Sequence, residues 1–331
     1  MTNNEKLRFL TNQLNVLYPS KEKIFEMAMK NVTQLPLPTR LMVSNVLMKG
    51  SFDVIGLLGS GQFGNVYLAT PKGDSNCVAV KLSMIRNAID IKVASAELEM
   101  SERRKKEKIS CMLPYLDGTS SLSNVINAHP LDNVQFVMPV GLSYTQYMKY
   151  ILKLKKNILS RREMLALMYH LFSNLTIMHN HDILHRDIKP DNILLIPSPN
   201  GGIKLVFSDF GTSRVISATD FVTQCGSPMF MPISIRTAPV LDELSPEVAM
   251  KFDVYSVAIT CYTILDGFQP MESKQKQEMV AYRPVGLPRP DYCTDDDIWN
   301  ILKSIIYHSD NLSLIPSAEE VCDKLDVLLF R

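Results

Sequence analysis

One stretch of the sequence decides the fold: His185-Arg186-Asp187-Ile188-Lys189-Pro190-Asp191-Asn192. Asp187 can accept the proton of an incoming hydroxyl group or orient that group, and Lys189 can neutralise charge on a transferred phosphoryl group. Asn192 can supply an oxygen ligand to Mg²⁺, a hard cation that prefers oxygen. Chance seldom brings these residue types together at this spacing, so we interpret the stretch as a catalytic loop rather than a generic polar loop.

A second carboxylate follows downstream. Asp209-Phe210-Gly211 comes directly after an apolar strand and offers a further oxygen ligand, so Asn192 and Asp209 are the predicted metal ligands. Other clusters are better explained structurally. The histidines at positions 179, 181 and 185 have no Cys or Asp cluster beside them, and Asp295 to Asp297 is typical of an exposed helix start.

A glycine-rich segment precedes both: Gly59-Ser60-Gly61-Gln62-Phe63-Gly64-Asn65-Val66. Glycines lack a Cβ atom, so backbone amides can approach phosphate oxygens closely. The same spacing also marks dinucleotide-binding domains, in which the motif opens a helix. Here a further strand-like run follows, so we expect a turn between two antiparallel strands that covers phosphates.

A lysine ends the next apolar strand, Val78-Ala79-Val80-Lys81. Its ammonium group can hold phosphate oxygens if an acidic partner fixes its rotamer. Glu97, on the helix expected next, is our choice for that partner. Glu99 and Glu102 remain alternatives, because spacing alone does not settle a helix register.

The pattern along the chain predicts a small β-rich region followed by a larger helical one. Short β-rich runs cover 52–59, 65–70 and 77–82, a helix is expected over 89–109, and strands are expected around Val125 and over 134–140. Past Tyr144 the sequence is mainly helical, with 161–181 the longest amphipathic run, and a loop at 197–202 separates two short strands. Residues 1–50 form a helical extension, in which leucines 7, 10, 14 and 17 recur at helical spacing.

Composition narrows the setting of the protein. Apolar residues make up 46% and charged residues 21% of 331 residues, with a formal net charge of +1. Such a balance does not recruit nucleic acid or a membrane surface, and the basic run 103–108 is best explained as a solvated helix face. The six scattered cysteines include no CxxC pair. We therefore expect a soluble intracellular protein.

From about Phe52 to its end the chain resembles the eukaryotic protein kinase family, because the four motifs occur in the order and at the spacings of that family. The resemblance implies an α+β, bilobal fold with a small antiparallel β-rich N-lobe and a larger α-helical C-lobe. The kinase domain would then cover 51–331, with the N-lobe at 51–138, the hinge at 139–142 and the C-lobe at 143–331. Lys189 and Ser227 resemble the serine/threonine branch.

The resemblance also assigns roles. Met138 would be the gatekeeper, Pro139 to Gly141 would face adenine, and Asp253 would anchor the central helix of the large lobe. Arg186 would contact a phosphorylated Thr223 in the activation loop. The residues expected to bind ATP are Gly59, Ser60, Gly61, Gln62, Phe63, Gly64, Asn65, Val66, Lys81, Met138 and Val140.

The chain departs from the family pattern in two places. Pro232-Ile233-Ser234 stands where the family has Ala-Pro-Glu, and Ile315 stands where the arginine partner of that glutamate would be. Losing both partners of a buried ion pair can be nearly neutral, whereas losing one costs roughly 3–5 kcal/mol. A rival alignment that uses Glu247 leaves too short a connection to Asp253. The second departure is a long connection over 109–123, for which the sequence gives no function.

The expected function is transfer of the γ-phosphate of ATP to serine or threonine hydroxyls of proteins. Asp187 would be the catalytic base, Lys189, Lys81 and Glu97 would assist it, and Asn192 and Asp209 would hold Mg²⁺. One alternative is a pseudokinase that binds nucleotide as a scaffold, and another is a kinase of small molecules. A regulatory partner at residues 1–50 is a further hypothesis, and no nucleic-acid or membrane partner is expected.

Overall fold

The computed structural model describes residue 6 and residues 19–61, 64–154, 159–198, 202–216, 226–237, 244–267 and 286–330. The chain divides into two compact units. The β-rich unit consists of Tyr18–Leu142 and Leu194–Gly211, and the helical unit of Met1–Leu17, Ser143–Ile193 and Thr212–Arg331. The segment from Leu194 to Gly211 thus belongs with the β-rich unit.

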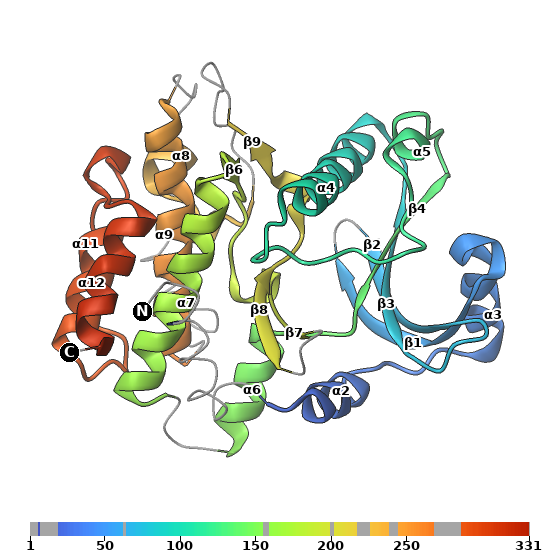
Figure 1. The fold of residues 1–331 in the computed structure, drawn as a ribbon, viewed down its shortest axis with the longest axis horizontal. Helices are drawn as coiled ribbons and strands as arrows, with labels where there is room; N and C mark the ends of the chain where they lie inside the picture. Colours follow the sequence, from blue (N-terminus) through green and yellow to red (C-terminus); the bar gives the residue numbers. More distant parts are fainter. Residues whose placement is uncertain are drawn as a thin grey trace. The chain divides into compact units, whose positions relative to one another are not determined.

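The β-rich unit is built on a four-stranded antiparallel sheet in the order β1-β2-β3-β4 (Figure 1). Its strands are β1 (Phe52–Gly61), β2 (Gly64–Pro71), β3 (Val78–Met84) and β4 (Asn133–Pro139). Lys81 lies opposite Val66 on one side and Phe136 on the other. The expected antiparallel sheet is therefore confirmed, and β1 and β2 pair on either side of the glycine-rich segment up to Gly61 and Gly64.

The N-terminal extension packs onto this sheet. Its helices are α2 (Lys21–Lys30) and α3 (Leu37–Val46), and the 3-10 turn η1 (Leu47–Gly50) leads into β1. Val43 and Leu47 join the apolar core on one side of the sheet, and Ala28 packs with Leu68 and Val140 in a separate cluster. The four leucines at positions 7 to 17 lie outside the described residues.

One predicted strand is wrong. Val125 lies in a short helix, α5 (Leu122–Ile126), which the side chain of Ser121 caps by accepting a hydrogen bond from the backbone of Asn124. A serine at this position satisfies an orphan amide of the first turn and so favours a helix over an extended chain. Helix α4 (Ala88–Glu107) matches the expected helix, and Asn87 caps it.

The loop expected at 197–202 lies between β7 (Ile193–Pro197) and β8 (Ile203–Phe207), which share a small sheet with β5 (Leu142–Ser143). Cys111 and Leu113 exchange backbone hydrogen bonds with Phe207, each at 2.8 Å. The long connection after α4 is thus attached to the end of β8.

The helical unit is organised around buried helices. Its long helices are α6 (Tyr144–Leu154), α7 (Arg161–His179), α9 (Pro246–Leu265), α11 (Asp296–Ile306) and α12 (Ala318–Phe330). Short elements of this unit are β6 (Ile183–Leu184), η2 (Pro190–Asn192), β9 (Arg214–Val215), η4 (Pro228–Phe230), α8 (Ile233–Thr237) and η7 (Leu312–Leu314). The 3-10 turn η3 (Phe210–Thr212) begins in the β-rich unit and ends in this one. Helix α7 packs against both α9 and α12 (Figure 1).

Helix α7 differs from its expected amphipathic character. Every residue from Met164 to Leu175 is buried, because neighbouring helices cover more than one face. Helix α9 is similar: it is long and apolar enough to cross a membrane, but 83% of its apolar window is buried inside the protein. A core helix meets the same criteria of length and composition.

Burial of His170 in α7 predicts a pH dependence of stability. Burial lowers the pKa of His170 from 6.5 to about 4. The unfolded chain therefore takes up a proton near pH 6.5, and the folded chain does not until about pH 4. The stability contributed by the neutral imidazole is fully present above pH 6.5 and is lost as the pH falls to 4, a loss of about 3 kcal/mol.

Urea unfolding at several pH values checks this prediction. The variant His170→Asn should lose less free energy of unfolding between pH 6.5 and 4 than the native chain does. His129→Asn, at an exposed position, is the control and should keep the native pH dependence. Equal pH dependence in the native chain and in His170→Asn would contradict the assignment.

Candidate active site

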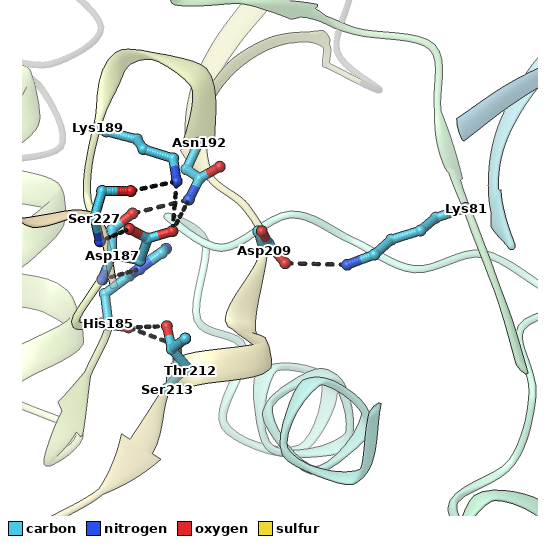
Figure 2. Close-up of polar contacts among 9 residues, drawn as sticks. All are labelled: Lys81, His185, Asp187, Lys189, Asn192, Asp209, Thr212, Ser213 and Ser227. Carbon is cyan, nitrogen blue, oxygen red and sulfur yellow. Dashed lines mark hydrogen bonds and ion pairs between the residues drawn. The ribbon is translucent and has the colours of Figure 1, made fainter. Parts of the chain in front are cut away.

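The first group of polar residues lies within the β-rich unit. The Lys81 ammonium group is 2.8 Å from Oε2 of Glu97 and 3.0 Å from Oδ1 of Asp209. Figure 2 shows Lys81 extended toward Asp209. Glu97 is 2% exposed, the Lys81 side chain 12% and the Asp209 side chain 32%. Two carboxylates therefore share one largely buried ammonium group.

The helix register selects Glu97 among the three candidate glutamates. Asn87 fixes the start of α4, since its side chain accepts hydrogen bonds from the backbone of Ile89 and Asp90. Of the three, the structure pairs Glu97 with Lys81 and buries it, whereas the side chain of Glu99 is exposed. Residues four positions apart lie on the same helix face, which is why Glu97 shares its buried face with Ser101.

Burial and charge act against each other in this group. Burial alone would lower the pKa of Lys81, but the charges of Glu97 and Asp209 and their hydrogen bonds raise it above its usual value. Burial raises the pKa of the Glu97 carboxyl, and the charge and hydrogen bond of Lys81 oppose this rise. Lys81 is therefore a permanent cation, held where its charge is poorly screened by water.

Glu97 has a second partner that the sequence did not indicate. Tyr115 donates its hydroxyl to Oε1 of Glu97, and its ring packs against Phe136 with 5.4 Å between centroids. The Lys81 ammonium lies 5.5 Å from the centroid of the Phe136 ring. Only the unexplained length of the connection over 109–123 marked this segment in the sequence.

The glycine-rich turn is tight at Gly64. Its φ is +140°, and a Cβ there would lie 2.4 Å from the carbonyl oxygen of Leu82, so only glycine fits. At Gly59, by contrast, a Cβ would meet nothing within 4 Å. Ser60 and Asn65 pair between β1 and β2, and Asn65 also lies opposite Leu82 on β3, followed by Val66 opposite Lys81. Gln62 and Phe63 lie outside the described residues.

The gatekeeper candidate Met138 lies near the end of β4, and the hinge candidates begin at the last residue of that strand. Met138 lies opposite Ala79 on β3 and is 7% exposed. Val140 is also 7% exposed and packs beside Leu68. The structure thus places Met138 beside the strand that carries Lys81, and Val140 beside β2.

The second group of polar residues lies within the helical unit and surrounds Asp187 (Figure 2). Oδ2 of Asp187 accepts hydrogen bonds from Lys189 Nζ at 2.7 Å and from Asn192 Nδ2 at 3.0 Å. Oδ1 accepts one from the backbone N–H of Ser227 at 2.8 Å. The carboxylate is 9% exposed and its orientation is fixed from three sides.

Ser227 closes this group through its hydroxyl, which accepts a hydrogen bond from Lys189 at 2.7 Å. Gly226, the preceding residue, has a φ of +91°, and a Cβ there would lie 2.1 Å from the carbonyl oxygen of Arg186. Glycine is therefore required for this backbone to approach the loop that carries Asp187. The Asp187 carboxylate is thus surrounded by an ammonium group from Lys189, an amide from Asn192 and the backbone of Ser227, whose hydroxyl contacts Lys189.

Asp253 of α9 holds the backbone of this loop. It is fully buried, and its two oxygens accept hydrogen bonds from the backbone N–H groups of His185, at 2.7 Å, and Arg186, at 2.8 Å. Arg186 has a φ of +65°, a strained conformation for a residue with a side chain. The two hydrogen bonds to a buried carboxylate stabilise this conformation.

The departures from the family pattern carry no charge. Ile315, at the arginine position, is 1% exposed, and Ser234, at the glutamate position, is partly buried and donates its backbone N–H to the carbonyl of Ser309 at 2.9 Å. Glu247 lies in the first turn of α9, with its side chain 82% exposed and 3.8 Å from Lys251. Glu247 therefore does not serve as a buried ion-pair partner. Thr223 lies outside the described residues, and its phosphorylation stays a prediction.

The clusters interpreted as structural also have clear partners. Asp295 caps α11 by accepting a hydrogen bond from the backbone of Ile298, and it pairs with Arg161. His179 lies 3.6 Å from Asp253, and His181 bonds the carbonyl of Ile177. Across the ranges that the structure describes, three or more His, Cys, Asp or Glu side chains nowhere gather in a metal-binding arrangement.

Replacement of Asp253 tests its anchoring role. Asp253→Asn places an amide N–H₂ where one backbone donor needs an acceptor, so the free energy of unfolding should fall by about 3 kcal/mol. Urea denaturation measures this loss. Asp182→Asn is a matched control at an exposed site with φ +55°, which asparagine tolerates, and it should change stability by less than about 0.5 kcal/mol. Similar stabilities for the two variants would contradict the anchoring role.

Comparisons with known proteins indicate the family of the chain. Residues 52–313 match the family described as the protein kinase domain. The probable serine/threonine-protein kinase gdt4 of Dictyostelium discoideum is 29% identical over 294 residues, covering 86% of this chain and 16% of that protein. Calcium/calmodulin-dependent protein kinase type 1 of Caenorhabditis elegans is 24% identical over 80% of this chain and 70% of its own length. The Aurora kinase of Patiria pectinifera is 28% identical over 71% and 52%.

The extent of these matches differs among the relatives. The chain spans only 1% of a titin homolog of Caenorhabditis elegans, to which it is 25% identical, and 16% of gdt4. The similarity therefore concerns a domain that several longer proteins share.

Proposed function

The chain belongs to the protein kinase family, and on that premise we propose that it transfers the γ-phosphate of ATP to serine or threonine hydroxyls of protein substrates. One observation carries the proposal: both sets of residues that phosphoryl transfer needs are present and oriented by hydrogen bonds. Lys81 is held by Glu97, and the Asp187 carboxylate is held by Lys189 and Asn192.

The roles follow from the chemistry of each side chain. Lys81 is a permanent cation and would bind oxygens of the ATP phosphates. Asp187 would orient the acceptor hydroxyl and take up its proton on the carboxylate. Lys189, at 2.7 Å from Asp187, would neutralise charge on the phosphoryl group during transfer. The family set is thus complete at every position that handles phosphate or hydroxyl.

The donor set fits Mg²⁺, which the family uses with ATP. The carboxylate of Asp209 and the amide oxygen of Asn192 are hard oxygen ligands, and Asn192 directs its nitrogen toward Asp187. When bound, Mg²⁺ neutralises phosphate charge. A Cβ at Gly59 would meet no neighbouring atom, so packing within the chain does not require glycine there. Close approach of the backbone to a bound phosphate would explain the glycine.

The contact between Lys189 and Ser227 favours serine and threonine as acceptors. In the family branch that the sequence resembles, a hydroxyl residue at this place contacts the catalytic aspartate and its lysine. Ser227 accepts from Lys189 and donates its backbone N–H to Asp187. We propose that this arrangement places a serine or threonine hydroxyl at Asp187.

A transfer assay with radiolabelled ATP and a generic protein acceptor tests the proposal. The native chain should label serine or threonine, and Asp187→Asn should lower the rate about 10²–10⁴-fold, because it removes the base. Asp310→Asn, at an exposed position of the helical unit, is the control and should keep the native rate.

Three other results would contradict the proposal. ATP binding by the native chain without transfer would favour a nucleotide-binding scaffold. Phosphate found mainly on tyrosine would overturn the acceptor class. Transfer by Asp187→Asn at the native rate would overturn the role of Asp187.

A further inference from the structure

We propose that Tyr115 is a positioning residue for Lys81: its hydroxyl holds Oε1 of Glu97, so that Oε2 stays directed at the ammonium group. The inference rests on the proposed function, since it concerns how the phosphate-binding lysine is oriented. It also gives a role to the long connection over 109–123.

The two oxygens of Glu97 are divided between two partners. Oε2 is 2.8 Å from Lys81, and Oε1 accepts the hydroxyl hydrogen of Tyr115. Glu97 is 2% exposed and Tyr115 is 4% exposed, so water has little access to replace either partner. A carboxylate held at both oxygens cannot rotate about its last bond without losing a hydrogen bond.

Backbone hydrogen bonds on both sides of Tyr115 fix its position, so that its hydroxyl can orient Glu97. Its neighbour Leu116 donates a backbone hydrogen bond to Val137 on β4 at 2.7 Å. On the other side, Leu113 donates to Phe207 at the end of β8 at 2.8 Å. Tyr115 therefore sits on a short bridge between β4 and β8, and its ring packs against Phe136.

The same bridge connects the two carboxylates that share Lys81. Strand β8 ends at Phe207, two residues before Asp209, so the backbone of the bridge is tied to the segment that carries Asp209. Its Tyr115 side chain is tied to Glu97 on α4. Arg104, also on α4, donates to the carbonyl of Met112 at 2.8 Å and fastens the helix to the start of the bridge.

Competition for Lys81 makes this anchor necessary. Asp209 and Glu97 both attract the ammonium group and repel each other, since each carries negative charge. Without the Tyr115 hydroxyl, one oxygen of Glu97 would be buried without a donor, and the carboxylate would rotate or withdraw. Lys81 would then be drawn toward Asp209 and away from the orientation that binds phosphate.

The test compares Tyr115→Phe with the native chain in the phosphate transfer assay. Removing the hydroxyl while keeping the ring should lower kcat/KM about ten- to a hundredfold, because it deletes a hydrogen bond to a buried charge. Tyr255→Phe is the matched control: Tyr255 is buried in α9, and its hydroxyl has no hydrogen-bond partner in the described parts of the chain. This control should keep the native kcat/KM.

A second comparison separates positioning from packing. In the background Glu97→Gln, adding Tyr115→Phe should cause little further loss, because Tyr115 acts through Glu97. An equal loss in both backgrounds would show that Tyr115 serves only the packing of the unit and would overturn the proposal. Native activity in Tyr115→Phe would overturn it as well.

An NMR measurement tests the contact without relying on activity. In protein labelled with ¹³C at tyrosine Cζ, the signal that disappears in Tyr115→Phe identifies Tyr115, and Glu97→Gln should shift that signal. A signal that does not move would overturn the inference even if the native chain is an active kinase. If the native chain transfers no phosphate, the proposed function is wrong, but the contact of Tyr115 with Glu97 is not thereby disproved. The shift of the Cζ signal then tests that contact by itself.

Discussion

A buried ammonium group that must be shared between two carboxylates is the constraint on which the β-rich unit depends. Lys81 cannot lie in the middle of β3, which continues to Met84, at low exposure unless opposite charges meet it, because an unpaired buried charge costs several kcal/mol. Glu97 reaches it from α4 and Asp209 from the segment after β8. The sheet register, the cap of α4 and the bridge that carries Tyr115 all fix these three positions.

In the helical unit, the buried carboxylate of Asp253 stabilises the loop that carries Asp187. The loop that carries Asp187, the proposed catalytic carboxylate, contains a backbone conformation that residues other than glycine avoid, the positive φ of Arg186. Asp253 supplies two charged acceptors from a fully buried position on α9, and the loop is held against the core of the unit. Where the family has a further buried ion pair, this chain has Ser234 at the glutamate position and the buried Ile315 at the arginine position. Loss of both partners of a buried ion pair costs little stability, because neither charge is left unpaired, which fits a divergent but intact fold.

Motifs in which each residue has a chemical role could be predicted from the sequence. The remaining features depend on contacts that form only when the chain folds. The antiparallel sheet, the helix over 88–107 and family membership were predictable, because glycines, β-branched runs and the His185–Asn192 loop signal them locally. The contact of Glu97 with Lys81 was only a choice among three, since it depends on where Asn87 starts the helix.

Other features could not be derived locally. Val125 was misjudged because an apolar residue at that spacing fits a strand, and the serine cap that makes a helix acts through one hydrogen bond. For Tyr115 the sequence showed only an unexplained long connection and not its partner, which lies 18 positions away along the chain and meets it only after folding. Burial around the whole of α7 likewise depends on helices that are distant in the sequence.

The most direct test of the central claim is a crystal structure of the chain with Mg²⁺ and a non-hydrolysable ATP analogue. The account predicts that Lys81 contacts phosphate oxygens while it keeps its bond to Glu97, and that a metal ion contacts Asp209 and Asn192. A bound nucleotide whose phosphates make no contact with Lys81 would contradict it.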